Sequence, residues 1–549
     1  MKYFPSGGRW LIIPLLALAG LVPIHAQSAN DASFLSTLGE LRMATYDDKA
    51  AIAEKLSRTG HPSVRAVLTA LLEERLYYRN SDQKVFIAKV ADADPLSLID
   101  PLSLKSAGSA SADSMTQIGT NNALRRLVRI TVARFSLGSP EPSVRVDAVR
   151  EMARSLDEPT VALLRAREGI EKNSRVKAEI DRALALATLD GNDNKARLAA
   201  VATLRDSVSE DVRNRLALLL GKNPDGSFVE SDAALRQAAA SAVARIDRWR
   251  NFYSDVQTLF FGLSLGSVLV LIAIGLAITF GVMGVINMAH GELMMLGAYT
   301  TYVVQTAMPG HIGISILVAI PAAFIVAGLT GVVLERTIIQ FLYGRPLETL
   351  LATFGVSLIL QQSVRSIFSA LNRSVVTPDW MSGSLRLNDA LSITYNRLYI
   401  VIFTLIVFAL ILLVLRRTRL GLDIRAVSQN RAMAKAMGVR TEWVDAMTFG
   451  LGSGVAGVAG VALSQLTNVG PDLGQSYIID SFLVVVFGGV GNLWGSLIGG
   501  MSMGVVNNLL QPYAGAVLAK IFVLVALILF IQVRPRGLFP QKGRAAEDK

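Results

Sequence analysis

The chain has 549 residues, 52% of them hydrophobic, and a formal net charge of +11. It contains no cysteine, which excludes disulfides, thiolate chemistry and cysteine-bound metals. The basic excess lies largely in short segments between long apolar runs of the second half, as is typical of the cytoplasmic loops of membrane proteins. No basic patch is interleaved with aromatic residues, so nucleic acid is not an expected partner.

Residues 1–28 have the pattern of a secretory signal peptide. Lys2 and Arg9 flank the start of a short apolar stretch, and the small residues Ala26 and Ser28 follow it. This order of basic, apolar and small residues is typical of an export signal. Two outcomes remain open, cleavage near these small residues or retention as an anchor, and in both the next domain is exported.

Residues 29–250 are charged, lack a long apolar run and are predicted to form an exported α-helical domain. PSVR occurs at residues 62–65 and 142–145, each time opening a helical apolar pattern. Proline, then Val-Arg, then an apolar stripe resembles HEAT-type repeats. The alternative is an irregular helical domain with two chance matches. We expect residues 106–114 to be a flexible linker and His61 to lie on the surface. Further helices are expected at residues 174–189, 209–220 and 231–246.

Residues 251–541 are predicted to form a polytopic α-helical membrane bundle of about eight hydrophobic segments, followed by a cytoplasmic tail at 542–549. Runs of about 20 apolar residues have the length needed to cross a bilayer. They are expected at residues 256–280, 283–305, 312–333, 347–370, 397–415, 442–466, 477–499 and 517–533, with a half-length run at 501–511. The fold class is therefore all-α.

The loop at residues 416–440 sets the expected orientation. It carries seven basic residues and one acidic residue, Asp423. Such a loop is expected in the cytoplasm, whereas the charge-balanced segment 371–396 is expected outside. An exported N-terminal domain and a cytoplasmic C-terminus require an odd number of crossings.

Residues 275–299 place Asn287, His290 and Glu292 inside an otherwise apolar region. Ionisable groups at membrane depth are costly unless they face a bundle interior or a water-filled path, and glycines such as Gly291 allow a helix to break there. One interpretation is a discontinuous element in which these four residues line the translocation path of a polar solute. The other is a short turn at the cytoplasmic surface, with Asn287 and Glu292 capping helices.

Residues 424–450 are expected to contain a short amphipathic helix in the basic loop. Asn430 can cap its start and Gly438 can end it in a left-handed conformation. Arg431 and Lys435 lie on one face, and an apolar face is formed by Ala432, Met433, Ala436 and Met437. A helix of this kind can dock in a groove of a cytoplasmic partner. An ordinary basic loop is the alternative.

Residues 266–310 and 421–505 resemble the permeases of the branched-chain amino acid family of ABC importers, the LivH type. GVMGVINMAHGELMMLGAY resembles the first signature of the family, and VVVFGGVGNLWGSLIGG at 484–500 is similar to a later one. Ala434-x-x-x-Gly438 resembles the core of the coupling-helix motif. The resemblance implies that the helix contacts an ATPase subunit through Asn430, Arg431, Ala434, Lys435 and Gly438.

The resemblance implies a transport subunit, not an enzyme, in the bacterial inner membrane. The chain has no phosphate-binding G-x-x-x-x-G-K-[ST] loop, so ATP is expected on partner subunits. No catalytic residues, metal site or cofactor is expected on this chain. The implied partners are two ATPase chains, a second related permease and a periplasmic binding protein.

The exported domain departs from ordinary members of the family. It is similar to the extension that follows the signal sequence in the permeases of urea importers, which implies urea as the solute and a periplasmic N-terminal domain. The alternatives are an importer for branched-chain or polar amino acids or short amides, a channel or secondary carrier, and a membrane-anchored scaffold.

Overall fold

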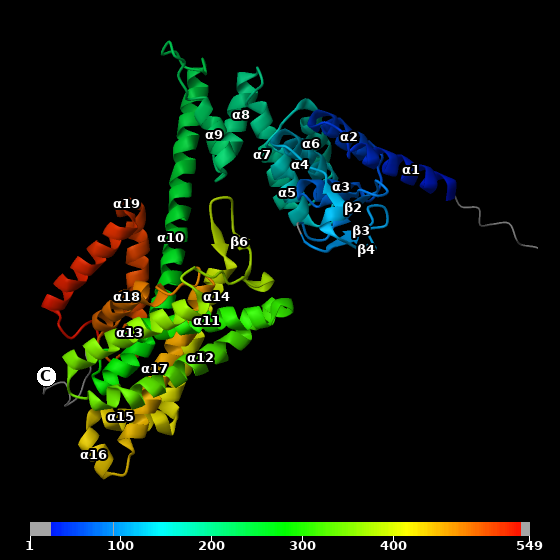
Figure 1. Cartoon of the computed structure of the whole chain (residues 1–549). Helices are drawn as coiled ribbons and strands as arrows, with labels where there is room; N and C mark the ends of the chain where they lie inside the picture. Colours follow the sequence, from blue (N-terminus) through cyan, green and yellow to red (C-terminus); the bar gives the residue numbers. More distant parts are fainter. Residues whose placement is uncertain (1–23, 92, 540–549) are drawn as a thin grey trace, which may run out of the picture. The chain divides into compact units, whose positions relative to one another are not determined.

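The computed structural model describes residues 24–91 and 93–539 (Figure 1). Two compact units divide these residues. The first unit contains residues up to Ser207 together with Asp211–Arg245, and the second contains Val208–Glu210 and the residues from Ile246 onward. Residues 1–23 of the predicted signal peptide lie outside the described residues. The whole predicted tail at 542–549 lies outside them as well.

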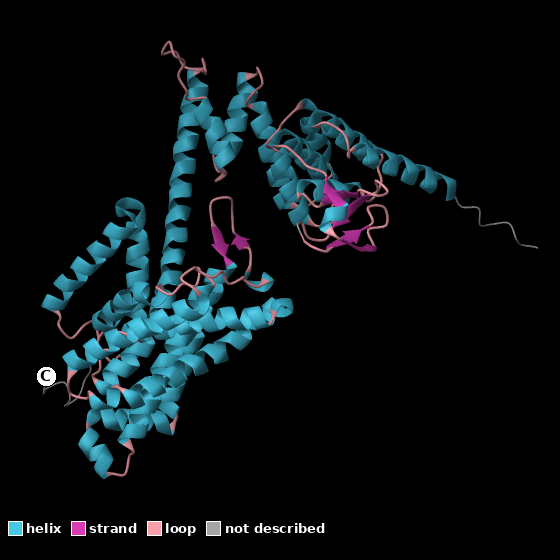
Figure 2. Cartoon of the chain, viewed as in Figure 1, coloured by secondary structure: helices cyan, strands magenta, loops and turns pink. Residues whose placement is uncertain are grey.

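The first unit is mainly helical (Figure 2). Its helices are α1 (Ile24–Glu40), α2 (Tyr46–Arg58), α3 (Val64–Leu72), α4 (Asn122–Ser136), α5 (Pro142–Met152), α6 (Glu158–Glu168), α7 (Ser174–Thr188), α8 (Asn194–Leu204), α9 (Glu210–Leu218) and the first part of α10 (Ala233–Met283). Several begin at a polar side chain that accepts a hydrogen bond from a backbone N–H of the first turn, as at Thr45, Asn121, Asp157, Asn173 and Asp193.

The first unit also contains a five-stranded antiparallel sheet, which the sequence analysis did not predict (Figure 2). The strands are β1 (Leu76–Arg79), β2 (Val85–Ala88), β3 (Leu96–Ile99), β4 (Ser106–Ala110) and β5 (Met115–Gln117), in the order β4-β3-β2-β1-β5. The expected flexible linker at residues 106–114 is therefore wrong. Its first part is the edge strand β4, whose small, largely exposed residues are held by backbone pairing with β3 and not by side-chain burial.

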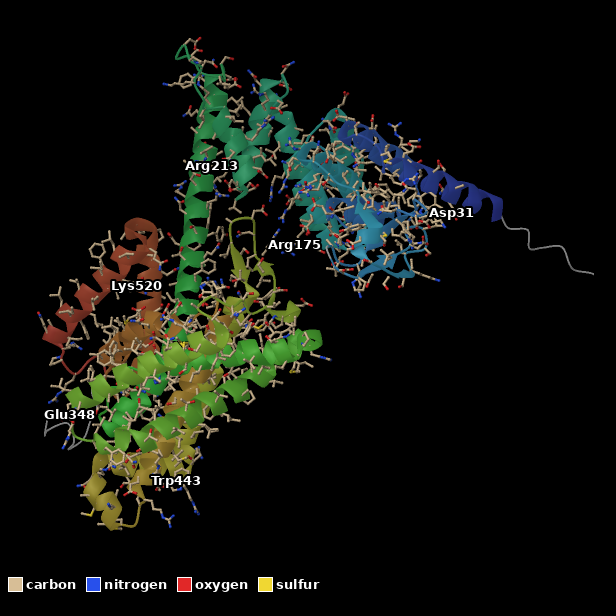
Figure 3. The ribbon with its side chains drawn as sticks, in the orientation of Figure 1. Asp31, Arg175, Arg213, Glu348, Trp443 and Lys520 are labelled. Carbon is tan, nitrogen blue, oxygen red and sulfur yellow. The ribbon has the colours of Figure 1, made fainter. Side chains whose placement is uncertain are left out.

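The expectation that His61 lies on the surface is also wrong. Its side chain is 8% exposed, because α1 covers it. The ring stacks on Phe34 with 4.3 Å between centroids, and Nε2 lies 3.2 Å from Oδ1 of Asp31, which Figure 3 labels. The Nδ1 atom accepts the N–H of Ser63 at 3.2 Å. His61 therefore fixes the packing of α1 against the start of α3.

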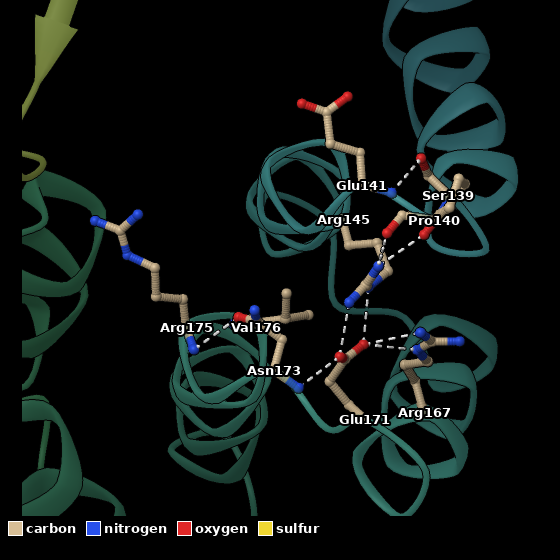
Figure 4. A network of polar contacts seen from close by, with 9 residues as sticks. All are labelled: Ser139, Pro140, Glu141, Arg145, Arg167, Glu171, Asn173, Arg175 and Val176. Atoms are coloured by element: carbon tan, nitrogen blue, oxygen red, sulfur yellow. Dashed lines mark hydrogen bonds and ion pairs between the residues drawn. The ribbon is translucent and has the colours of Figure 1, made fainter.

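An arginine and a glutamate tie α5 to the start of α7 (Figure 4). Arg145 donates from Nε and Nη2 to the two carboxylate oxygens of Glu171, each at 2.9 Å. Glu171 Oε1 also accepts the N–H of Asn173, the residue that caps α7. Arg145 is 8% exposed and belongs to the interior of the unit.

The same arrangement recurs in the next part of the first unit. Arg197 on α8 donates to Glu230, and Glu230 Oε1 accepts the N–H of Asp232 just before α10, at 2.9 Å. In each of the two arginine–glutamate pairs, a buried glutamate in the loop before one helix thus holds the arginine of an earlier helix. This recurrence favours the repeat interpretation of the helical domain over an irregular one.

The second unit is a polytopic helical bundle, and the predicted fold class is confirmed for it. Its helices are the rest of α10, α11 (His290–Ala307), α12 (Ile312–Thr337), α13 (Pro346–Phe368), α14 (Tyr395–Arg417), α15 (Arg419–Gln429), α16 (Arg431–Ala436), α17 (Thr441–Ser464), α18 (Leu473–Gly488) and α19 (Leu493–Val533), with a hairpin of β6 (Ser384–Arg386) and β7 (Ser392–Thr394). Among the described residues, six helices are long and apolar enough to cross a membrane: α10, α12, α13, α14, α17 and α19.

The predicted apolar run at 477–499 is not one segment. Helix α18 ends at Gly488, and Gly489 and Gly491 take positive φ values of 101° and 76° in the turn before α19. The half-length run at 501–511 lies within α19, which is kinked at Gly515 (φ 79°). Hydropathy does not register these breaks, because glycine permits the left-handed backbone without interrupting the apolar pattern.

The loops of the second unit gather at two ends. One end, the basic end, contains residues 416–440. There the backbone N–H of Leu538 donates a hydrogen bond to the carbonyl oxygen of Phe487 at 2.9 Å. At the opposite end, Arg373 and Val469 exchange backbone hydrogen bonds of 2.7 and 2.8 Å, and the side chain of Gln305 bonds to the backbone of Val376. Figure 3 labels Glu348 and Trp443, near the starts of α13 and α17, on the side of the basic end. The apolar helices run between these ends.

Helices cross closely where two glycines meet. A Cβ atom on Gly297 of α11 would lie 2.0 Å from the carbonyl oxygen of Gly457 of α17, and one on Gly504 of α19 would lie 2.3 Å from the backbone nitrogen of Gly266 of α10. Small residues allow such approach in membrane bundles. Helix α11 is thereby held against α12 and α17 in the middle of the bundle.

Candidate functional site

Helix α11 begins in the interior of the bundle and not at its end. His290 donates from Nε2 to the carbonyl oxygen of Ile272 at 3.1 Å. Ile272 lies about 16 Å before the end of α10 at a rise of 1.5 Å per residue. The non-helical residues 284–289 therefore turn back into the bundle, and Gly284 allows this with a φ of 66°. Irregular backbone at this depth is tolerated only where protein or a polar cavity surrounds it.

The candidate path residues Asn287, His290 and Glu292 are 1%, 0% and 1% exposed. Asn287 Oδ1 accepts the N–H of Ala289 at 3.0 Å. Glu292 Oε1 accepts a hydrogen bond from Nε2 of Gln361 on α13 at 2.5 Å. Their burial favours the discontinuous element over a turn at the surface, and no side chain caps the start of α11, whose N-cap residue is Ala289.

A row of buried polar side chains on α13 faces these residues and was not predicted from the sequence. The row consists of Thr349, Thr353, Ser357 and Gln361, which are 1%, 2%, 5% and 6% exposed. Thr353 Oγ1 accepts the N–H of Met288 at 3.1 Å, and Ser357 Oγ accepts from Gln361 at 3.3 Å. Positions four apart share one helix face. The polar residue at every fourth position of the apolar run at 347–370 was therefore a sequence signal that could have predicted this row.

The start of α18 also lies beside the start of α11. A Cβ atom on Gly291 would lie 2.4 Å from the carbonyl oxygen of Gly474. Just before α18, Asp472 accepts from Nη2 of Arg365 on α13 at 2.5 Å. Two helix N-termini with their partial positive charges thus meet next to the polar row of α13, and the start of α18 is exposed on one side, where Asp472 lies. Discontinuous helices arranged in this way form solute sites in other transporters.

Some polar atoms of this region have no hydrogen-bond partner among the described residues. They are Asn287 Nδ2, His290 Nδ1, Glu292 Oε2 and the hydroxyl of Tyr299. An unpartnered buried polar atom costs about 1–3 kcal/mol. The set offers a carboxylate acceptor and an amide donor, which suit a small polar solute that both donates and accepts hydrogen bonds.

Helix α16 lies at the basic end and has the ends that the sequence suggested. Asn430 Oδ1 accepts the N–H of Met433 at 2.9 Å. At the other end Gly438 has a φ of 88°, its N–H bonds to Lys435 O at 3.1 Å, and the N–H of Val439 bonds to Ala434 O at 3.0 Å. This pair of bonds is a Schellman motif, which requires the left-handed glycine.

One face of α16 is anchored and the other is exposed. Ala434 is 6% exposed and packs with Ile424, Val427 and Val444. Met433 and Met437 are 60% and 79% exposed. Flexible methionine side chains exposed together are typical of a surface that a partner covers.

The structure does not bring the two candidate sets together. The path residues lie inside the bundle, whereas Asn430 to Gly438 lie at its basic end. Within the described ranges, no group of three or more His, Asp or Glu side chains is arranged to hold a metal ion.

Several known proteins match the second unit. The family model described as "Branched-chain amino acid transport system / permease component" matches residues 258–533. The high-affinity branched-chain amino acid permease LivH of Salmonella typhimurium is 33% identical over 310 residues, which cover 54% of this chain and 98% of LivH. BraD of Pseudomonas aeruginosa is 31% identical over 306 residues, with the same shares. The ribose import permease RbsC of Escherichia coli is 25% identical over 279 residues, 47% of this chain and 78% of RbsC. No solved structure matches the chain.

The apolar helices and the matched relatives identify a multi-pass inner-membrane permease of the ABC transporter class. The chain belongs to the family of permease components of branched-chain amino acid transport systems.

Proposed function

We propose that this chain is the membrane-spanning permease subunit of an ATP-driven importer of urea, of the UrtB type. Its route for the solute passes the start of α11, where Asn287, His290, Gly291 and Glu292 meet the polar row of α13. The single observation that carries this proposal is that α11 starts at His290 inside the bundle, with the carboxylate of Glu292 1% exposed.

The chemistry of this region supports a small uncharged solute. Urea offers N–H donors and a carbonyl acceptor and carries no charge. A carboxylate oxygen such as Glu292 Oε2 accepts from N–H groups, and an amide nitrogen such as Asn287 Nδ2 donates to a carbonyl. A zwitterionic amino acid would in addition need an apolar pocket for its side chain, whereas its carboxylate would find partial positive charge at the N-termini of α11 and α18.

The first unit supports urea over the solutes of the matched relatives. The match to LivH covers 98% of that protein but only 54% of this chain, and the family match begins at residue 258. The helical domain before it is what the chain shares, by resemblance, with permeases of urea importers. We place this domain in the periplasm, where it can contact a solute-binding protein.

The ends of the second unit support this orientation. Asn508 donates to the carbonyl oxygen of Thr258 at 2.6 Å, and a pocket of about 260 Å³ is lined by residues of both α10 and the segment before β7. Helix α10 therefore enters the bundle at the end opposite the basic loops. Trp249, Phe252 and Tyr253 contact one another there, as aromatic residues do at a membrane surface. The basic end then faces the cytoplasm.

Helix α16 supports coupling to ATPase subunits. Its exposed methionines at 433 and 437 would insert in a groove of one ATPase chain, while Ala434 holds the helix against the bundle. The proposed assembly contains two ATPase subunits, a second related permease and a periplasmic binding protein. A channel or secondary carrier would not need such a helix.

Branched-chain amino acids are the second candidate for the solute, because LivH and BraD are named for them. Reconstitution separates the two. The complete complex in liposomes, with the binding protein outside and ATP inside, is expected to accumulate carbon-14 urea and not carbon-14 leucine. Accumulation of leucine alone would move the assignment to the second candidate, and equal urea entry without ATP would indicate a channel.

A further inference from the structure

Four side chains from separate segments form one connected network at the basic end. Arg431, the first residue of α16, donates from Nη1 to Oδ1 of Asp445 on α17 at 3.2 Å and from Nη2 to Oδ2. The guanidinium also lies over the ring of Tyr343, 4.8 Å from its centroid. The hydroxyl of Tyr343 donates to Oε1 of Glu335 on α12 at 2.8 Å. Arg431 is thus linked directly to α17 and indirectly to α12.

The network is anchored by two carboxylates that water does not reach. Asp445 is 0% and Glu335 is 1% exposed, whereas the side chain of Arg431 is 42% exposed. Arg336 Nε lies 3.6 Å from Glu335 and provides a second cation. A buried carboxylate that loses its cation remains as an uncompensated charge, which is strongly unfavourable. A movement of α16 that separates Arg431 from Asp445 is therefore unfavourable. A movement of α16 together with α17 keeps the ion pair and does not carry this cost.

The helices that the network joins are those on which α11 rests. Both α12 and α17 pack along α11, and Gly457 of α17 touches the backbone of Gly297. A displacement of α16 that carries α12 and α17 with it would change the packing around the start of α11, where the candidate path lies.

We propose that Arg431 is a positioning residue that makes α16, α12 and α17 move as one body. Displacement of α16 by a nucleotide-driven partner is thereby passed to the helices around α11. The proposal rests on the proposed function in one respect: an ATPase subunit is what displaces α16.

The first test measures distances and needs no solute. The chain has no cysteine, so spin labels can be attached to V333C on α12 and Q429C directly before the cap of α16, both at exposed positions. In the assembled complex, the distance between the labels is expected to be the same without nucleotide and with trapped ATP. In an added Arg431→Met variant the distance is expected to shift or broaden with ATP. A distance that changes in the parent, or that stays constant in the variant, would overturn the proposal.

The second test separates positioning from a merely structural role. Arg431→Met is expected to reduce ATP-dependent uptake of carbon-14 urea by about tenfold or more while ATP hydrolysis by the complex continues. Tyr343→Phe keeps the ring under Arg431 and removes the links of the hydroxyl to Glu335 and Asp445, so it should show the same uncoupling more weakly. Arg417→Met removes an exposed charge at the same end of the bundle and should leave uptake unchanged.

The outcomes distinguish this proposal from the proposed function. Unchanged urea uptake per ATP in both Arg431→Met and Tyr343→Phe would refute the network and leave the importer in place. A wild-type complex that takes up no urea would refute the solute assignment, and the label distances would still decide the network. If Arg431→Met fails to assemble, Tyr343→Phe gives the decision.

Discussion

A Cβ atom on Gly474 would lie 2.4 Å from the carbonyl oxygen of Gly291, so the first turns of α18 and α11 touch backbone to backbone. No side chain fits between them. This contact brings two helix N-termini together next to the carboxylate of Glu292. Because both partners are glycine, the approach depends on neither side chain and is sensitive to any added atom.

Replacing Gly291 by alanine is therefore expected to push α11 and α18 apart. Overpacking of this kind costs about 1–3 kcal/mol, and we expect reduced thermal stability of the complex and loss of most solute uptake. Gly355→Ala is the matched control, because a Cβ atom at that helical glycine meets nothing within 4 Å. Equal behaviour of the two variants would show that the contact between α11 and α18 does not matter.

Two adjacent glutamines of α13 test the polar row. Gln361 is 6% exposed and donates to Glu292, whereas Gln362 is exposed. Gln361→Ala leaves a buried carboxylate oxygen without its donor, at a cost of about 1–3 kcal/mol, and uptake is expected to fall about tenfold at unchanged protein level. Gln362→Ala should be close to wild type. An equal loss in both would contradict the placement of the path at the start of α11.

Gly438 tests the end of α16. Space is available there, since a Cβ atom would meet nothing within 4 Å, but the φ of 88° disfavours most residues. Gly438→Val is expected to cost about 1–2 kcal/mol in this conformation and to abolish uptake while the complex still assembles. Gly438→Asn should retain much of the activity, because asparagine tolerates the left-handed region. Wild-type uptake by the valine variant would count against a coupling role.

Glu171 tests the interior of the first unit. Its hydrogen bond from Arg145, together with backbone and Arg167 contacts, lowers the pKa of its carboxyl to about 2. A carboxyl whose pKa is lower in the folded state stabilises the fold above its unfolded pKa, and this contribution is lost as pH falls through the folded value. Hydrogen exchange of residues 139–176 in the full chain should therefore accelerate as pH falls from about 4.5 toward 2, beyond the intrinsic change of the exchange rate.

The corresponding variant is Glu171→Ala, which leaves Arg145 buried without its partner. Removing one member of a buried ion pair costs about 3–5 kcal/mol, so exchange of α5, α6 and α7 is expected to rise at neutral pH. Glu158→Ala, at an exposed position of α6, is the control. Unchanged protection of α5 to α7 in Glu171→Ala would mean that the pair does not hold the repeat together.

Local signals in the sequence predicted the ends of α16 well. Asn430 and Gly438 act within a few residues of their own positions, and their roles follow from hydrogen bonding and backbone preference alone. The bundle was predictable because long apolar runs have few alternative structures. The break at Gly489 and Gly491 was not, because it lies inside a continuous apolar pattern.

Long-range pairs were beyond what the sequence could predict. Arg145 and Glu171 lie on different elements, and only the packing of α5 against α7 brings them together. The sheet of the first unit was missed because its strands are three to five residues long. The row on α13 was missed although its spacing of four residues was present in the sequence.

The most direct test of the central claim is uptake in cells that lack only this chain, grown under nitrogen limitation. Labelled urea and labelled leucine are offered separately, with the wild-type gene and the Gln361→Ala variant restored in parallel. We predict that urea uptake is lost, that leucine uptake is retained, that the wild-type gene restores urea uptake fully, and that Gln361→Ala restores only about a tenth of it. Retained urea uptake in the deletion strain, or loss of leucine uptake alone, would contradict the assignment.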